Sequence, residues 1–272
     1  MGFFTPSEFL TNYSNAGVNK AKLSIGRIFI LGILAGAFIA FASTCANMAS
    51  HNVTAAGLAR LLSAIMFPFG LCMVVLLGAE LFTGNCLMII SVLDRQITVG
   101  QMIRNWVVAY IGNFVGSLLV AAGCAFAGQF SYSAAGLAAV TIKTAAAKCS
   151  LGFGSAIVLG IMCNALVCIA VLHAFSAKDV AGKILGIFLP VCFFVLAGFE
   201  HSIANMYYIP AGLFALVNDT YREAAIAAGV DLSMLTWGNC LIRNLLPVTI
   251  GNIIGGCGIG VLMWFGHGKN KK

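Results

Sequence analysis

Charged residues are scarce in this sequence. Asp, Glu, Lys and Arg make up only 8% of its 272 residues, against roughly 25% in ordinary soluble proteins. A folded soluble domain of this size could not cover its surface with so few charges, and 61% of the chain is hydrophobic. The composition therefore indicates an integral membrane protein. Nucleic-acid binding is excluded as well, because the basic residues behind the net charge of +7 are scattered between apolar runs.

The sequence also lacks the patterns that hold metals and cofactors. Its ten cysteines are spread through apolar runs, with no C-x-x-C and no Cys/His cluster of metal-binding spacing. We expect free, buried thiols, no metal and no cofactor. No nucleophile or metal set accompanies His201 and Glu200, and neighbouring residues of one helix point apart, so an enzyme is not expected.

No stretch is long and polar enough for a soluble domain. Residues 1–27 are too polar for a signal peptide, and Thr5-Pro6-Ser7-Glu8 is typical of a helix start. We predict a cytoplasmic interfacial helix in 1–27, one transmembrane pore domain over 28–266, and a cytoplasmic tail over 267–272.

Six apolar runs are long enough to span a bilayer, which needs ~20 residues. They cover residues 28–48, 61–93, 106–128, 154–175, 184–217 and 242–266. The second and fifth are too long for one plain helix and carry polar interruptions at 78–85 and 198–205. We therefore predict an all-α membrane protein in which helices 2 and 5 are broken.

Basic residues are distributed unequally between the two sides of these spans. With six spans both termini share a side, and ten Lys and Arg residues fall there against five on the other. The positive-inside rule places both termini in the cytoplasm. We expect a multi-pass protein of the inner or plasma membrane of a prokaryote.

The two interrupted spans belong to an internal repeat. Residues 75–85 align with 195–205 at an offset of 120, with Val, Leu, Gly, Glu and Asn in matching places. Ile-Gly-Asn-x-x-Gly occurs at 111–116 and again at 250–255, and Leu-Gly-Ile at 31–33 and 159–161. Residues 28–128 therefore repeat as 154–266. Three spans per repeat make the second copy inverted, and paired broken helices indicate a site at the midplane between the repeats.

Each break carries ionisable or polar side chains at membrane depth, where such groups are costly and often functional. For Glu80 and Glu200 we favour a structural role, capping backbone N–H groups that the breaks leave unpaired. His201 has Leu81 as its repeat partner, so symmetry does not require it, and we assign it to the pore. Thr83 offers a hydroxyl to a dehydrated ion.

Further polar positions lie outside the breaks. Asn164 and Asn205 either line the pore or join helices. Lys148, in the loop before the fourth span, is a cation that can raise the local concentration of anions at a pore mouth. Half-helix N-termini also attract anions, so the permeant species should be small and anionic, or a neutral acid that ionises.

Two segments resemble a known family. Gly-Phe-Glu-His-Ser-Ile-Ala-Asn-Met at 198–206, followed by Ile209-Pro210, is similar to the signature of the formate/nitrite transporter family. Gly-Ala-Glu-Leu-Phe-Thr at 78–83 and the Pro247–Gly256 segment resemble two further family segments. The resemblance implies a homopentamer of aquaporin-like protomers in the lipid bilayer, each with its own pore.

The resemblance also implies roles for individual residues. It places Leu81, Phe82 and Thr83 in the break loop and His201 at the pore centre. It makes Lys148 the vestibule lysine, and it lines the path with Asn164 and Asn205. An outer hydrophobic constriction is implied at Phe67, Leu71 and Phe194.

Within that family, the chain looks most like the hydrosulfide channel branch. Hydrosulfide suits a narrow apolar pore because it is compact, weakly hydrated and neutral once protonated. Formate or nitrite is the alternative, through a passive channel or a proton-coupled carrier. A neutral-solute channel of aquaporin type is a distant alternative, because its paired Asn-Pro-Ala boxes are absent.

Overall fold

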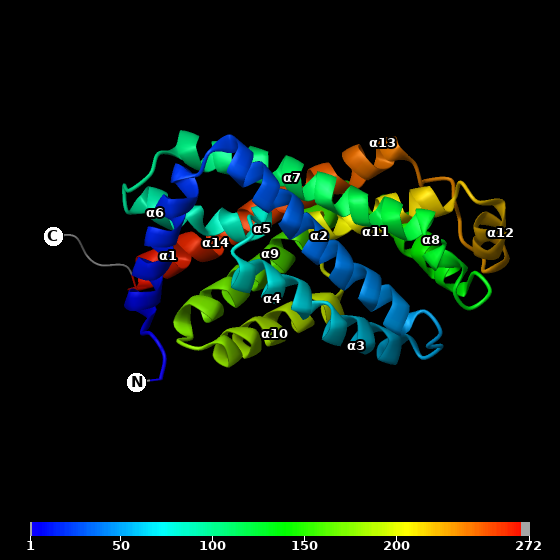
Figure 1. Cartoon of the computed structure of the whole chain (residues 1–272), viewed down its shortest axis with the longest axis horizontal. Coiled ribbons are helices and arrows are strands. Elements are labelled where there is room, and N and C mark those ends of the chain that lie inside the picture. The colour runs from blue at the N-terminus through cyan, green and yellow to red at the C-terminus, as the bar shows by residue number, and fades with distance from the viewer. Residues whose placement is uncertain (1, 268–272) are drawn as a thin grey trace.

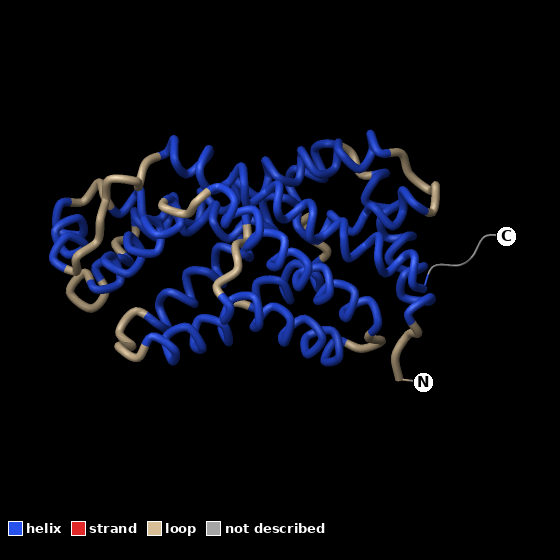
Figure 2. Tube along the Cα trace, turned by 180° about the vertical axis from the view of Figure 1, so that it is seen from behind, coloured by secondary structure: helices blue, strands red, loops and turns tan. Residues whose placement is uncertain are grey.

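The computed structural model describes residues 2–267, and this part of the chain is helical with short loops (Figure 1, Figure 2). Its sole β-type pairing is an isolated bridge between Phe3 and Ala177. The helices are α1 (Pro6–Lys22), α2 (Ile25–Ser50), α3 (Ala56–Met66), α4 (Pro68–Leu77), α5 (Phe82–Asn85), η1 (Cys86–Met88), α6 (Ile89–Leu93), α7 (Val99–Phe126), η2 (Gln129–Ser131), α8 (Gly136–Cys149), α9 (Phe153–Ser176), α10 (Val180–Ala197), α11 (Ser202–Ala215), α12 (Asp219–Ala227), α13 (Trp237–Asn239), the π-helical η3 (Cys240–Leu245) and α14 (Leu246–His267). The all-α prediction is confirmed.

The six predicted spans are also confirmed. Within the described residues, six helical stretches are long and apolar enough to cross a membrane, namely Ile25–Ser50, Ala56–Leu77, Val99–Phe126, Phe153–Ser176, Val180–Ala197 and Trp237–His267. Several begin before the predicted start. α7 begins at Val99 rather than 106, because Thr98 caps it: the hydroxyl of Thr98 accepts a hydrogen bond from the N–H of Gln101, whose side chain accepts one from the N–H of Thr98. Hydropathy cannot detect such polar first turns.

Helices 2 and 5 are broken where the sequence predicts. α4 ends at Gly78 and α10 ends at Gly198, both with left-handed backbone (φ +69° and +75°) that glycine adopts without steric cost. After each glycine the chain is extended, and helix resumes at Phe82 in α5 and at Ser202 in α11. The half-helices therefore end and begin inside the molecule.

The two halves of the chain use the same packing, as the inverted repeat predicts. α2 packs along α7 in the first half, and α9 packs along α14 in the second. A Cβ on Gly112 would lie 3.0 Å from the Cα of Gly32, and a Cβ on Gly251 would lie 3.0 Å from the Cα of Gly160. These glycines allow the paired helices to touch backbone to backbone, as the small-residue spacing predicts.

Two short helices, α1 and α8, precede the two repeats. α1 starts as predicted: the Glu8 carboxylate accepts hydrogen bonds from the N–H and the hydroxyl of Thr5, and these bonds hold the pKa of Glu8 below its ordinary value. The search for apolar spans does not detect α8, because this helix is too short and too polar to cross a membrane. The loop position predicted for Lys148 is therefore wrong, because Lys148 lies in the last turn of α8.

Both ends of the described chain lie at the same end of the molecule, beside α1 and α6 (Figure 1). α3, α8 and α12 lie at the opposite end, which we call the α8 end. Apart from His267, the predicted tail 267–272 lies outside the described residues.

Candidate functional site

The two break loops meet at His201 and Thr83. The Nε2 atom of His201 lies 2.9 Å from the hydroxyl oxygen of Thr83, 118 residues away in the chain. His201 is 3% exposed and Thr83 is fully buried. The structure thus joins the predicted pore histidine and pore threonine in one hydrogen bond at the interface of the repeats.

Neighbouring backbone fixes the proton on the imidazole. His201 is the N-cap of α11, and its Nδ1 accepts a hydrogen bond from the N–H of Ala204 at 3.1 Å. Because Nδ1 is an acceptor, the neutral ring carries its proton on Nε2 and donates it to Thr83. The ring is therefore a donor aimed at the contact between the two breaks.

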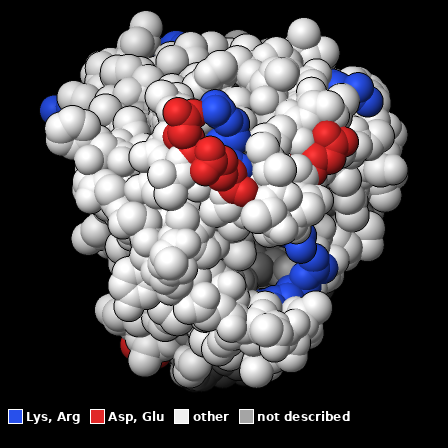
Figure 3. All heavy atoms as spheres, turned by 90° about the vertical axis from the view of Figure 1, so that its right-hand side faces the viewer, with Lys and Arg blue, Asp and Glu red and all other residues white. Residues whose placement is uncertain are grey.

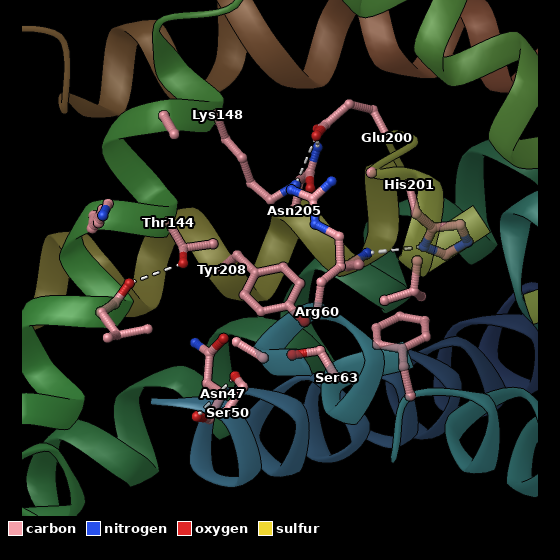
Figure 4. A pocket seen from close by; sticks show the side chains of 18 of the residues that line it. Asn47, Ser50, Arg60, Ser63, Thr144, Lys148, Glu200, His201, Asn205 and Tyr208 are labelled. Carbon is pink, nitrogen blue, oxygen red and sulfur yellow. Dashed lines mark hydrogen bonds and ion pairs between the residues drawn. The ribbon is translucent and has the colours of Figure 1, made fainter. Parts of the chain in front are cut away.

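A cavity of about 580 Å³ leads from the surface to this histidine. Basic side chains border a hollow on the surface of the α8 end (Figure 3). The close view of the cavity shows side chains from α2, α3, α8 and α11 pointing into it, with His201 at its inner limit (Figure 4). Its basic lining residues are Arg60, Lys143 and Lys148, and its one acidic lining residue within the described range is Glu200.

Aromatic rings close the inner end of the cavity. The ring of Phe67 meets the ring of Phe194 edge to face at 5.7 Å, and the ring of Phe194 stacks on His201 at 5.9 Å. Phe67 and Phe194 line the cavity, and both are buried. The two rings therefore lie beside the histidine that bonds Thr83.

The two buried glutamates form ion pairs, and these pairs are related by the repeat. Glu200 accepts from the Nζ of Lys148 at 2.9 Å, and Glu80 accepts from the Nζ of Lys20 at 2.6 Å. Each glutamate also accepts from an asparagine five residues later, Asn85 at 2.7 Å or Asn205 at 2.6 Å. The predicted capping is wrong, because no described backbone N–H donates to either carboxylate; a structural role for the two glutamates stays a prediction, and these side-chain contacts are consistent with it.

Two other asparagines, Asn113 and Asn252, cap the break loops. The Asn113 side chain accepts from the N–H of Phe82 and donates to the carbonyls of Gly32 and Glu80, at 2.8 to 3.0 Å. Asn252 does the same for the N–H of Ser202 and the carbonyls of Gly160 and Glu200, at 2.9 to 3.0 Å. Asn113 and Asn252 belong to the Ile-Gly-Asn motif that recurs in the two halves, and this recurrence is the sequence signal for the two amides.

Asn164 and Asn205 occupy different surroundings. Asn205 lines the cavity. Asn164 is fully buried and lies outside the cavity lining, where its amide donates to the carbonyls of Thr83 at 3.2 Å and Asn252 at 2.7 Å. It thus ties the first break loop to the cap of the second.

The structure separates the predicted site residues into two groups. His201, Lys148, Asn205, Phe67 and Phe194 line the cavity. Glu200 lines it as well, whereas the remaining predicted residues lie outside the lining and are buried: Leu71, Glu80, Leu81, Phe82, Thr83 and Asn164. Sequence reasoning missed other polar lining residues, notably Asn47, Arg60, Lys143, Thr144 and Tyr208. Arg60 and Lys143 were counted only toward orientation.

Comparison with known proteins gives a consistent match. The formate/nitrite transporter family model matches residues 7–265. A probable formate transporter of Methanothermobacter thermautotrophicus is 36% identical over 98% of this chain and 98% of its own length. The formate channel FocA of Haemophilus influenzae is 40% identical over 93% of this chain and 90% of its own.

Solved structures show the same fold. A pentameric formate channel with formate bound has a TM-score of 0.79 and 33% identity, covering 89% of this chain and 96% of its own. An ion channel of the same family has a TM-score of 0.81 and 25% identity, covering 95% and 98%.

Proposed function

This chain belongs to the formate/nitrite transporter family, and on that premise we propose that it forms a membrane channel for small monovalent anions. One observation carries the proposal. A cavity lined by three basic side chains and one acidic side chain ends at two aromatic rings and a histidine that donates from Nε2. Positive lining concentrates anions, and a buried donor replaces the hydrogen bonds that an anion loses with its water.

The path begins at the α8 end and runs inward. The basic lining draws the anion into the cavity, and Phe67 and Phe194, with Leu71 behind them, remove its water. Beside the rings, at the inner limit of the cavity, the Nε2–H of His201 and the hydroxyl of Thr83 bind the dehydrated anion, and Asn205 lines the approach. Leu81 and Phe82 keep the far side of this contact apolar. In this mechanism His201 takes up a proton from cavity water at Nδ1 and gives its Nε2 proton to the anion, so that the ring ends neutral and the substrate passes the apolar residues as a neutral acid.

Three anions are candidates for the physiological role. The resemblance of the sequence to the hydrosulfide channel branch favours hydrosulfide, and the buried aromatic rings support it because they favour a compact, weakly hydrated ion. Formate is supported by the relatives, two of which carry formate in their names. Nitrite shares the size and charge of formate.

We further propose the assembly and placement of the channel. A pentameric neighbour of the same fold supports a homopentamer, with one pore in each protomer. The excess of basic residues at the end that holds both termini supports a cytoplasmic location for that end, in a prokaryotic inner or plasma membrane.

Flux measurements test the proposed function. Purified protein in liposomes should conduct hydrosulfide, formate and nitrite well above empty liposomes, measured side by side at pH 6 and pH 7.5. The anion with the largest ratio of maximal flux to half-saturating concentration is the preferred substrate. Equal flux in loaded and empty liposomes for all three anions contradicts the proposal.

A further inference from the structure

The cationic lining of the cavity is not uniform. The Nζ of Lys148 lies 2.9 Å from the buried carboxylate of Glu200, so much of its charge is compensated. Arg60 and Lys143 line the same cavity, and within the described residues neither forms an ion pair. The uncompensated positive charge of the cavity therefore belongs to Arg60 and Lys143 rather than to the predicted vestibule lysine.

Arg60 reaches the deep part of the cavity. It lies on α3, and its side chain points into the cavity on the side of Lys148, Glu200 and His201 (Figure 4). One Nη atom lies 2.7 Å from the position that a Cβ on Gly198 would occupy. The guanidinium thus lies against the glycine that ends α10, two residues before Glu200.

The surroundings of this guanidinium give it no structural task. The described residues offer it neither a hydrogen-bond acceptor nor a carboxylate partner, whereas Arg104 donates to the carbonyls of Ala21 and Leu23. Up to five N–H donors of Arg60 are thus available to a ligand in the cavity. The cavity also presents the side chains of Asn205 and Tyr208 close by.

We propose that Arg60 forms an anion-binding site in the cavity, ahead of the aromatic closure, and that this site favours planar oxyanions such as formate and nitrite. The proposal rests on the proposed channel function and names the class of anion that its outer cavity binds. A guanidinium donates two parallel N–H bonds to a planar oxyanion. Hydrosulfide has a single acceptor atom and forms no such pair.

Three single variants in liposomes test this site. Arg60→Gln removes the charge, and Arg60→Lys keeps the charge but removes the planar pair of donors. Arg243→Gln is the matched control: Arg243 is exposed and lies outside the cavity lining. The half-saturating concentrations of formate, nitrite and hydrosulfide are measured for each variant, after size-exclusion chromatography shows the wild-type elution volume.

We expect Arg60→Gln to raise the half-saturating concentrations of formate and nitrite about 5-fold. This change corresponds to ~1 kcal/mol of binding free energy for a partly exposed charge pair. Arg60→Lys should leave the half-saturating concentration of hydrosulfide near the wild-type value, whereas the half-saturating concentrations of formate and nitrite should stay raised. Arg243→Gln should have the wild-type half-saturating concentration for each of the three anions.

Two results overturn the proposal. In the first, Arg60→Gln and Arg243→Gln have the same half-saturating concentration of formate, which would mean that the anion does not bind Arg60. In the second, Arg60→Lys has the wild-type half-saturating concentrations of formate and nitrite, which would mean that Arg60 acts only as a point charge. Both differ from failure of the channel function itself, in which the wild-type protein conducts none of the three anions.

Discussion

At the scale of residues, the Lys148–Glu200 ion pair lines the cavity, and we expect it to stabilise the fold. Lys148→Met leaves the Glu200 carboxylate buried and unpaired. Removing one partner of a buried pair costs about 3 kcal/mol, so the unfolding temperature in detergent should fall by roughly 5–10 °C. Thermal unfolding followed by circular dichroism measures this change.

The double variant separates pairing from anion attraction. Lys148→Met with Glu200→Gln removes both charges, so it should recover most of the lost stability. Lys20→Met is the matched control, because Lys20 pairs with Glu80 at the opposite end. Lys20→Met should lower the unfolding temperature about as much as Lys148→Met does. It should not change the half-saturating concentration of the anion at the α8 end. A stable Lys148→Met protein would show that the ion pair contributes little.

His201 governs the response of flux to pH in the proposed mechanism. His201→Ala removes the Nε2 donor to Thr83 and the Nδ1 acceptor of Ala204. A hydrogen bond to a charged group contributes about 1.5 kcal/mol, so loss of the Nε2 donor to the anion should lower flux by ~10-fold. Because no imidazole then lends a proton, the ratio of flux at pH 5.5 to flux at pH 7.5 should also fall.

His51 provides the control for this experiment. It lines the outer part of the cavity, and its ring nitrogens bond to the carbonyl of Met48 and the hydroxyl of Ser133. His51→Ala should keep the wild-type pH profile. If His201→Ala keeps it too, His201 lends no proton to the anion.

Sequence reasoning identified some of these residues but not their partners. Glu80, Glu200 and His201 stand out because ionisable groups are rare inside spans. Lys148 lies 52 residues from Glu200 in the chain, and no local spacing relates them. Arg60 was missed as a site residue for a similar reason: only folding brings α3 beside Gly198.

At the scale of elements, one asparagine holds each broken helix in place. Asn252 makes three hydrogen bonds, to Ser202, Gly160 and Glu200, that join α14, α9 and the second break. Asn252→Leu leaves those backbone groups unpaired inside the protein, which should lower stability by about 3 kcal/mol. The unfolding temperature and the flux of the variant, both expected to fall, are the measurements.

Asn239 is a suitable control for the asparagine substitution. Asn239 is half-buried at the end of α13, and its amide donates a single hydrogen bond to the carbonyl of Met234 in the preceding loop. Asn239→Leu should therefore change the free energy of unfolding by less than about 1 kcal/mol. Equal unfolding temperatures for Asn252→Leu and wild type would mean that the break loops hold their shape without this cap. Asn113→Leu repeats the test in the first half of the chain.

The elements themselves could be predicted largely from sequence, for physical reasons. Long apolar runs must form helices in a bilayer, since no water satisfies the backbone there, and Gly78 and Gly198 mark the breaks. The short helix α8 escaped prediction because Gly136–Cys149 is neither long nor strongly apolar. The placement of Lys148 in a loop was wrong for the same reason.

At the scale of the whole molecule, the inverted repeat makes the two ends similar in fold but not in charge. Glu80 and Glu200 each hold a lysine, and Asn113 and Asn252 make matching bonds, so these contacts treat both ends alike. The structure therefore does not dictate which end faces the cytoplasm. The orientation that we propose follows instead from the positive-inside rule, because the sequence carries ten Lys and Arg residues on the side predicted for the termini and five on the other.

This asymmetry predicts that the cavity of Arg60 opens to the outside of the cell. Alkaline phosphatase folds only outside the cytoplasm and green fluorescent protein inside it, so fusions of each report the side. After residue 272, the fluorescent fusion should be bright and the phosphatase fusion inactive. A phosphatase inserted at Gly128, in the loop at the α8 end, should be active. The reverse pattern would place the cavity in the cytoplasm, and its basic residues would then collect anions for export.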